Sequence, residues 1–219
     1  MNLRPIIFST PMVQAICDNR KTMTRRTRGL EDLIIDVGSG FVYNGKGNIQ
    51  LDIHSWKQDI LKHCPYGQVG DLLWVRETIY QNGELGLHYV ADGEHVDENI
   101  IPKDFNVRVD KNGHYKFCNI PNIFMPKALA RIWLEITDVR VERLHDISEE
   151  DSITEGIKVY DDKMFEFYTE QTLSNKIRPS IDSAKLSFAS LWISINGTES
   201  WKANPWVWVI KFKVLRGNK

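Results

Sequence analysis

Apolar and polar residues alternate most regularly in the segment ALARIWLEITDVRVER, between Ala128 and Arg143. A period of two places successive side chains on opposite faces of a strand, so this segment predicts a long half-buried strand or a bent strand pair. The segment LLWVRETI after Asp71 mixes Leu, Trp and β-branched residues and predicts a buried strand. The segment NPWVWVIKFKVL predicts a further strand with inward Trp and Val side chains.

Helical signals are short and lie between these strands. Thr10-Pro11 before MVQAIC predicts an N-cap, a proline in the first turn and a short helix that stops at Asp18-Asn19. The Thr- and Arg-rich segment KTMTRRTR that follows predicts a turn leading into an edge strand. SEEDSITEG starts like a capping box and predicts a two-turn helix that ends at Gly156. The segment SAKLSFASLWISIN has apolar residues at helical spacing and predicts a longer helix.

The order of these elements predicts an α+β fold. Strongly apolar strands favour a small closed or nearly closed β-barrel, flanked by short helices, because closure removes sheet edges. Gly-rich turns between residues 29 and 66 predict a hairpin-like insertion with a helix fragment near SWKQDILKH. We find no repeats and no linker long enough to separate domains, so residues 1–219 are expected to form one domain.

Composition narrows the class of protein. The chain is 42% hydrophobic and 11% aromatic, which is typical of a globular protein with a real core. No apolar segment is long enough to span a bilayer, and the N-terminus lacks the unbroken apolar stretch of a signal peptide, so we expect a cytoplasmic protein without membrane contact. Cys17, Cys64 and Cys118 form no CxxC pair and the six histidines form no HExxH motif, so we expect no metal and no cofactor.

Charge is distributed unevenly, although the net charge is only −1. Residues 1–30 contain six Lys and Arg residues and one Asp, whereas residues 141–160 contain six acidic residues and two basic ones. If folding brings these two segments together, the result is a charge-paired polar site and not a basic surface.

Four segments, taken in order, resemble the ASCH family of the PUA-like superfamily. They are RKTMTRR at 20–26, GDLLWVRET at 70–78, LEITDVRVERLHDISEEDSITEGI at 134–157 and the terminal WVWVIKFKVL. The longer form, with CPYGQVGD and NPWVWVI, is similar to proteins of phages and prophages, which implies a bacterial or phage-infected host cell. The resemblance implies a PUA-like barrel and an RNA-related role, with a modified nucleoside or RNA as partner.

Within that family, small bacterial N4-acetylcytidine amidohydrolases use a Lys, a Thr and a Glu. The matching motifs place these three catalytic roles at Lys21, Thr24 and Glu155. This chain is about twice as long, with extra segments near 29–66, 80–125 and 158–180. Those additions leave the identity of the substrate open.

The three residues suit amide hydrolysis, which needs a nucleophile, a base and an acid. Burial and the neighbouring Arg residues are expected to lower the pKa of Lys21 until it can accept a proton. Thr24, or a water held by it, would then be the nucleophile. Because Lys21 and Thr24 are three residues apart, a turn around Thr22-Met23 is needed to bring them together. Glu155 ends its helix, where the helix dipole favours the protonated acid that a leaving nitrogen requires.

Further side chains are candidates for holding the nucleic acid or substrate: Arg20, Arg25, Arg26, Trp74, Arg76 and Glu77. Guanidinium groups suit phosphate oxygens, and an indole can stack on a base. For each, an ordinary structural role is the alternative: an exposed basic turn, a core Trp, or a buried salt bridge in the Arg76-Glu77 pair. Two other functions stay open, a non-catalytic RNA-binding module and a ribonuclease.

Overall fold

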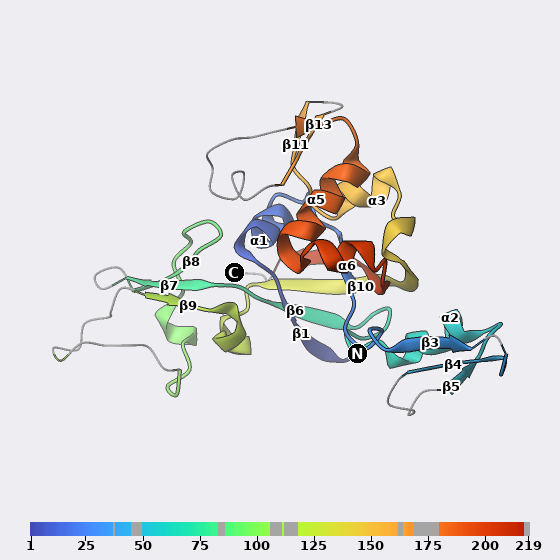
Figure 1. Ribbon diagram of the computed structural model, residues 1–219. Helices are drawn as coiled ribbons and strands as arrows, with labels where there is room; N and C mark the ends of the chain where they lie inside the picture. The colour runs from blue at the N-terminus through green and yellow to red at the C-terminus, as the bar shows by residue number, and fades with distance from the viewer. Residues whose placement is uncertain are drawn as a thin grey trace. The chain divides into compact units, whose positions relative to one another are not determined.

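The computed structural model describes residues 1–36, 38–44, 50–82, 86–105, 111, 118–161, 164–168 and 180–216. Over these residues the chain has a mixed α+β fold in which sheets dominate and the helices are short (Figure 1). The described strands form no closed barrel. The chain divides into two compact units, of which the first is Met1–Asn19, Asp71–Glu135 and Lys213–Lys219, and the second is Arg20–Gly70 and Ile136–Phe212. Each unit is built from segments that are separated in sequence by segments of the other. The expectation that residues 1–219 form one domain stays a prediction.

In the first unit, strand β6 (Leu72–Arg76) is an interior strand of a sheet with the order β1-β6-β10-β14-β2. It pairs in parallel with β1 (Leu3–Ile7) and antiparallel with the first residues of β10 (Ile132–Arg143). Leu73 and Val75 in β6 are fully buried, which confirms the strand expected in LLWVRETI. A second sheet has the order β8-β7-β9, with bounds Gly86–Tyr89, Ile79–Asn82 and Cys118–Ile120.

Helix α1 (Thr10–Cys17) also belongs to the first unit. It buries Val13, Ala15 and Ile16, and it carries a proline in its first turn, as the sequence predicts. Its N-cap is Ser9, so the prediction that Thr10 caps the helix is wrong by one residue. Three short 3-10 helices follow the strands of this unit, at Glu98–Ile100, Asn122–Phe124 and Lys127–Leu129.

In the second unit, β14 (Trp206–Arg216) lies between β10 and β2 (Met23–Arg26). The edge position of β2 in this order agrees with the edge strand expected in KTMTRRTR. Val207, Val209 and Ile210 are fully buried in β14, because this central strand is covered on both faces. The long alternating strand expected at 128–143 is confirmed for residues 132–143 as β10, which buries every second residue over its first half. Residues 128 and 129 belong to the preceding 3-10 helix, so the strand starts four residues later than expected.

The described residues of segment 29–66 form a three-stranded meander, where the sequence predicted a hairpin-like insertion, and the predicted helix fragment. Its strands β3 (Leu33–Asp36), β4 (Phe41–Asn44) and β5 (Gln50–Asp52) pair antiparallel in sequence order. The fragment is α2 (Trp56–Asp59), followed by a 3-10 turn at Ile60–His63.

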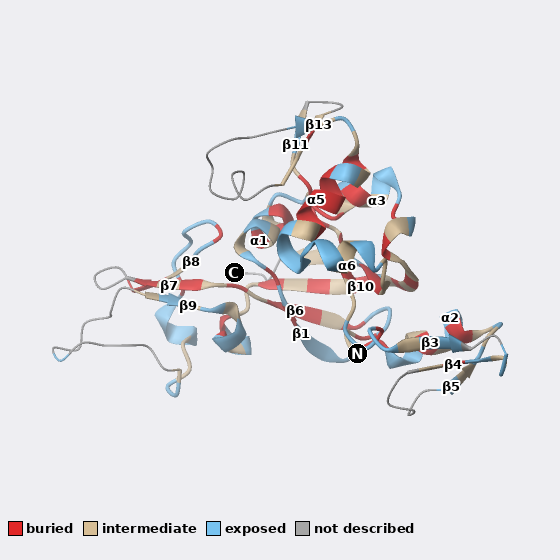
Figure 2. Cartoon of the chain, viewed as in Figure 1, coloured by how far each residue is buried: buried red, intermediate tan, exposed pale blue. Residues whose placement is uncertain are grey.

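The remaining helices of the second unit are α3 (Glu149–Thr154), α5 (Ala184–Asn196) and α6 (Thr198–Lys202), with a 3-10 turn at Leu144–Asp146 before α3. Helix α5 packs against α3 and buries much of its length (Figure 2). A three-stranded sheet lies between them in sequence, with bounds Val159–Asp161 for β11, Met164–Glu166 for β12 and Ser180–Ile181 for β13. Among the described residues, no helix is both long and apolar enough to cross a bilayer.

Candidate active site

The C-terminal end of α3 is joined to the segment that leads into β2. Ser148 caps the start of α3, and the helix ends with Glu155 as its C-cap and Gly156 at φ 91°. A left-handed conformation of this kind favours glycine and turns the chain away from the helix axis. Lys21 and Glu155 then form an isolated antiparallel β-bridge, and the Thr22 amide donates to the Thr154 carbonyl over 2.9 Å. Two residues 134 positions apart are thereby fixed face to face.

Lys21 and Glu155 form a buried ion pair. The Lys21 Nζ donates to the Glu155 Oε2 over 2.8 Å and to the Glu155 main-chain carbonyl over 2.7 Å. Lys21 is 2% exposed and Glu155 4% exposed. Burial lowers the pKa of Lys21, since it disfavours the charged amine more strongly than Glu155 stabilises it; Arg26 and Arg25 lower that pKa further. The direction of the shift agrees with the expectation that burial and the neighbouring Arg residues lower the pKa of Lys21, while its role as a base stays a prediction.

Arg25 holds the other oxygen of the same carboxylate. Its Nη1 donates to the Glu155 Oε1 over 3.0 Å, while Nε and Nη2 both reach the Glu142 Oε1 and Nη2 also reaches the Asp151 Oδ2. The Arg25 side chain is completely buried. Because a guanidinium has five N–H donors in a planar fork, one Arg can bind three carboxylates in this way.

The network continues outward through Arg140. This side chain donates to the Glu142 Oε2 over 3.1 Å and also to Asp151 and Asp138. The exposed fraction of the side chains falls from 46% at Asp138 and 33% at Arg140 to zero at Arg25. Folding does bring the basic N-terminal segment and the acidic segment 141–160 together, and the result is the charge-paired polar site that the sequence analysis expected for that case. The sequence analysis did not single out the individual partners Glu142, Asp151 and Arg140. The only signal for them was the opposite charge of residues 1–30 and 141–160.

Thr24 lies beside this network without joining it. It is 3% exposed, and it pairs with Ile210 of β14 in the sheet. Among the described residues, no hydrogen bond links the Thr24 hydroxyl to Lys21 or Glu155. The turn expected at Thr22-Met23 is absent, because Thr22 continues the extended chain: its amide bonds to Thr154 and its carbonyl accepts from Phe212. That expectation was wrong, because pairing on both sides keeps the backbone straight.

The two other arginines of this segment also have protein neighbours. Arg20 donates from Nη1 to the Gly156 carbonyl over 2.9 Å. Arg26 is half-buried, and burial lowers the pKa of its guanidinium. Arg25 would have to leave its carboxylates in order to bind a phosphate, whereas a phosphate contact by Arg20 or Arg26 stays a prediction.

The other three candidates, Trp74, Arg76 and Glu77, belong to the first unit and have partners there. The Arg76 guanidinium lies 5.5 Å from the centre of the Trp74 ring and donates to the main-chain carbonyls of Met125 and Ile123. Glu77 is 1% exposed and makes a two-pronged ion pair with Arg131, at 3.0 and 2.8 Å. Glu77 therefore takes part in a buried salt bridge, the structural role given above as the alternative to substrate binding, and its partner is Arg131.

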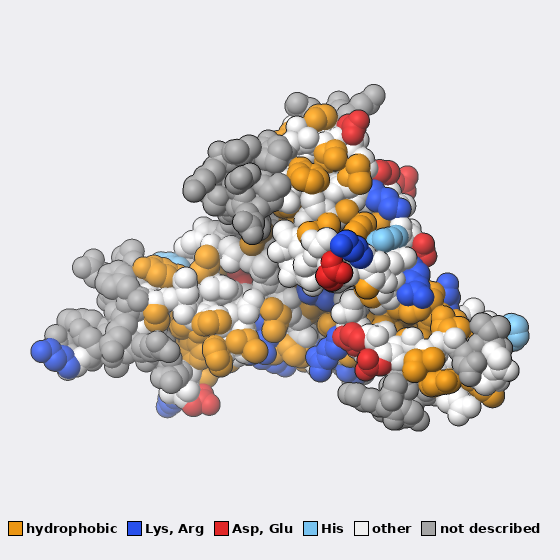
Figure 3. Space-filling model, in the orientation of Figure 1, with side chains coloured by type: hydrophobic (Ala, Val, Ile, Leu, Met, Phe, Trp, Pro, Cys, Tyr) orange, Lys and Arg blue, Asp and Glu red, His pale blue; other side chains and the backbone are white. Residues whose placement is uncertain are grey.

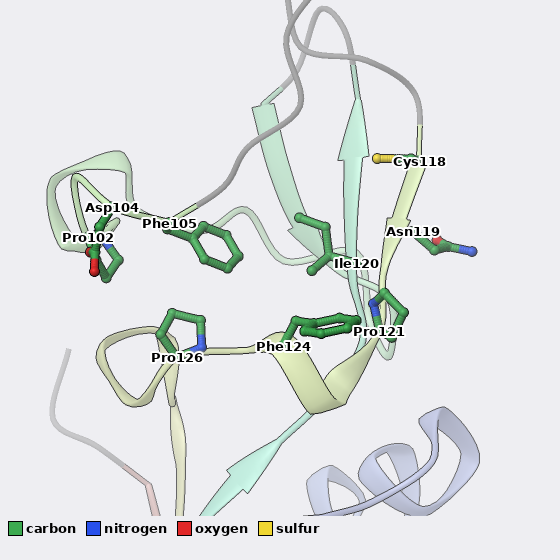
Figure 4. A pocket seen from close by; sticks show the side chains of 9 residues that line it. All are labelled: Pro102, Asp104, Phe105, Cys118, Asn119, Ile120, Pro121, Phe124 and Pro126. Atoms are coloured by element: carbon green, nitrogen blue, oxygen red, sulfur yellow. The ribbon is translucent and has the colours of Figure 1, made fainter.

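A pocket of about 550 Å³ also lies in the first unit. Its wall is mostly apolar, and the side chains of Phe105, Ile120, Phe124 and Pro126 converge on its centre (Figure 4). Asn119 points away from the centre. None of the candidate residues from the sequence lines this pocket.

Among the described residues, no group of three or more His, Cys, Asp or Glu side chains is arranged to hold a metal ion. Comparison of the chain with models of known protein families, with curated proteins and with solved structures found no match. The geometry of the site therefore carries the functional argument.

Proposed function

We propose that this chain is an ASCH protein with a PUA-like barrel, and that it hydrolyses an acyl amide on a modified pyrimidine nucleoside such as N4-acetylcytidine. The observation that carries the proposal is the buried hydrogen bond of 2.8 Å between the Lys21 amine and the Glu155 carboxylate. The segments that carry the family resemblance supply both of its residues. The strand order β10-β14-β2, with the end of α3 joined to β2, is the part of the fold that supports a PUA-like barrel.

One proton transfer turns this ion pair into an acid and a base. When the proton moves from the Lys21 Nζ to the Glu155 Oε2, it leaves a neutral amine and a carboxylic acid, a state that burial favours over two charges. The amine then accepts a proton from a water as the water oxygen attacks the acyl carbon. The acid protonates the leaving N4 nitrogen, so the products are a carboxylic acid and cytidine, and the pair returns to its charged form.

Access to the pair is part of this proposal. Because Lys21 and Glu155 are almost completely buried, neighbouring side chains must move before an acyl group reaches the amine. A closed site excludes water from the charged pair between turnovers.

The test is incubation of the purified protein with N4-acetylcytidine, with release of cytidine and acetate followed by chromatography. Lys21→Met should abolish turnover, whereas Lys211→Met, at an exposed lysine of β14, should leave it unchanged. Turnover that survives in Lys21→Met contradicts the proposed role of Lys21. If the wild-type protein releases no cytidine, the amidohydrolase activity itself is rejected for this substrate.

One observation favours a second function, a non-catalytic RNA-binding module. In the second unit, the Arg143 guanidinium lies 4.4 Å and the Lys57 amine 5.1 Å from the centre of the Trp206 ring. Among the described residues, neither cation forms an ion pair with a carboxylate. Cations beside an aromatic ring suit the phosphates and bases of a single strand.

This alternative ranks second because the described charges gather into no single basic patch on the face that Figure 3 shows. Binding of a short single-stranded RNA by fluorescence anisotropy would decide it. If the module binds RNA here, Arg143→Gln and Lys57→Gln should each weaken binding and flatten its salt dependence. Equal affinity in both variants and the wild type contradicts it.

A further inference from the structure

Glu155 divides its two carboxylate oxygens between two cations. Oε2 accepts from the Lys21 amine at 2.8 Å and Oε1 accepts from the Arg25 guanidinium at 3.0 Å. A carboxylate held by one cation alone is free to rotate about its terminal bond, because that torsion has a broad minimum. With both oxygens bound, the Glu155 group has one orientation, in which Oε2 faces the Lys21 amine.

Arg25 is in turn held by two further carboxylates. Glu142 binds Nε and Nη2, and Asp151 binds Nη2, so the plane of the guanidinium is fixed from the side opposite Glu155. Arg140 bridges Glu142 and Asp151 at the partly exposed end of the network. A lysine at position 25 keeps the positive charge, but it lacks the planar fork that spans Glu155 and Glu142 together.

We infer that Arg25 is a positioning residue of the proposed active site, which fixes the Glu155 carboxylate on the Lys21 amine while Glu142 and Asp151 fix Arg25. The catalytic role of Arg25 rests on the proposed function, whereas the hydrogen bonds that hold Glu155 and Arg25 do not depend on the substrate. This positioning role replaces the sequence-based expectation that Arg25 holds a phosphate or substrate, because the donors of its fork are directed at three carboxylates of the protein and at the Met23 sulfur.

The experiment compares Arg25→Lys, which keeps the charge, with Arg25→Gln, which removes it. If Arg25 positions Glu155 through its fork, Arg25→Lys should lose at least about tenfold in kcat for N4-acetylcytidine, close to the loss in Arg25→Gln. If the charge alone matters, Arg25→Lys should have wild-type kcat, and the inference is overturned. Arg131→Lys is the matched control, since Arg131 also forks onto a buried glutamate but belongs to the first unit.

A second readout does not depend on activity. The side-chain signal of Lys21 in ¹³C-lysine-labelled protein, assigned by its loss in Lys21→Met, reports the protonation of this amine directly. Attraction by Glu155 raises the pKa of Lys21 against the effect of burial. Release of Glu155 in Arg25→Lys should therefore move the Lys21 titration to lower pH, whereas Arg131→Lys should leave it in place.

These results separate the inference from the proposed function. A wild-type protein that fails to hydrolyse the substrate removes the catalytic proposal, yet a shifted Lys21 titration in Arg25→Lys still supports the positioning role. An unshifted titration overturns the inference whatever the activity. If Arg25→Lys does not fold, Glu142→Gln takes its place, because it removes the carboxylate that binds Nε and Nη2 of Arg25. Glu142→Gln should also move the Lys21 titration to lower pH. An unshifted titration in this variant overturns the inference as well.

Discussion

Replacing Glu155 by Gln tests the ion-pair network through the stability of the protein. Gln has nearly the shape of Glu, so the substitution removes the negative charge without opening a cavity. Lys21 and Arg25 then face an amide in place of a carboxylate, inside a site in which Glu155 is 4% exposed. Removal of one partner from a buried ion pair leaves a charge that neither water nor protein compensates.

The expected cost follows from the bonds that remain. Loss of one partner of a buried pair typically destabilises a protein by about 3–5 kcal/mol. Lys21 keeps the Glu155 main-chain carbonyl, and Arg25 keeps Glu142 and Asp151, so we expect the lower end of that range, about 3 kcal/mol. Glu150→Gln is the matched control, because Glu150 lies exposed in the first turn of α3 and its loss should cost at most about 0.5 kcal/mol.

Equilibrium unfolding in urea at pH 7 measures both variants, followed by tryptophan fluorescence. Trp192 and Trp208 are buried in the second unit and report on its unfolding. Coincident transitions in fluorescence and far-UV circular dichroism would justify a two-state treatment. If the free energies of unfolding of Glu155→Gln and Glu150→Gln agree within about 0.5 kcal/mol, the Glu155 charge does not stabilise the protein and the prediction is wrong.

Two further predictions concern the same part of the molecule. Because the pKa of Lys21 is lowered on folding from 10.5, the unfolded chain binds more protons between the two values, so wild-type stability should rise with pH in that alkaline window. Lys21→Met should lose this rise, as urea midpoints between pH 7 and pH 10.5 would show; parallel pH curves would contradict it. Ser148→Ala removes the hydroxyl that accepts from the Asp151 amide at 3.0 Å, and thermal unfolding should show a loss of about 1 kcal/mol. A Ser148→Gly variant should lose only about a few tenths of a kcal/mol in the free energy of unfolding. An equal loss in both variants would contradict a capping role for Ser148.

Local patterns in the sequence predicted the elements well. The alternation over 128–143, the Pro and Asp-Asn signals around α1 and the Ser148 capping box each correspond to an element that the structure contains, although the strand covers only 132–143. These patterns work because strand alternation, helix capping and glycine turns depend on residues that are neighbours in the chain. The N-cap of α1 was misplaced because Ser9 and Thr10 are both good caps, and only the backbone conformation separates them.

The site depended on less local information. The opposite charges of residues 1–30 and 141–160 left open whether these segments meet, and the family resemblance selected Lys21, Thr24 and Glu155. Nothing in the sequence showed that Arg25 faces three carboxylates or that Glu77 pairs with Arg131. The turn expected at Thr22-Met23 failed for the same reason, since backbone bonds to Thr154 and Phe212, both far along the chain, keep that segment extended.

By itself, the sequence determined the class of fold, most of its strands and helices, and the uneven distribution of charge along the chain. Those properties follow from periodicity, propensity and charge, which are local or additive along the chain. The tertiary structure decided which cation meets which carboxylate, because burial and hydrogen-bond geometry arise only where distant segments pack. Lys21 is the clearest example. The sequence supported an expectation that burial lowers its pKa, but the burial itself arises only where distant segments pack and remove water from the amine.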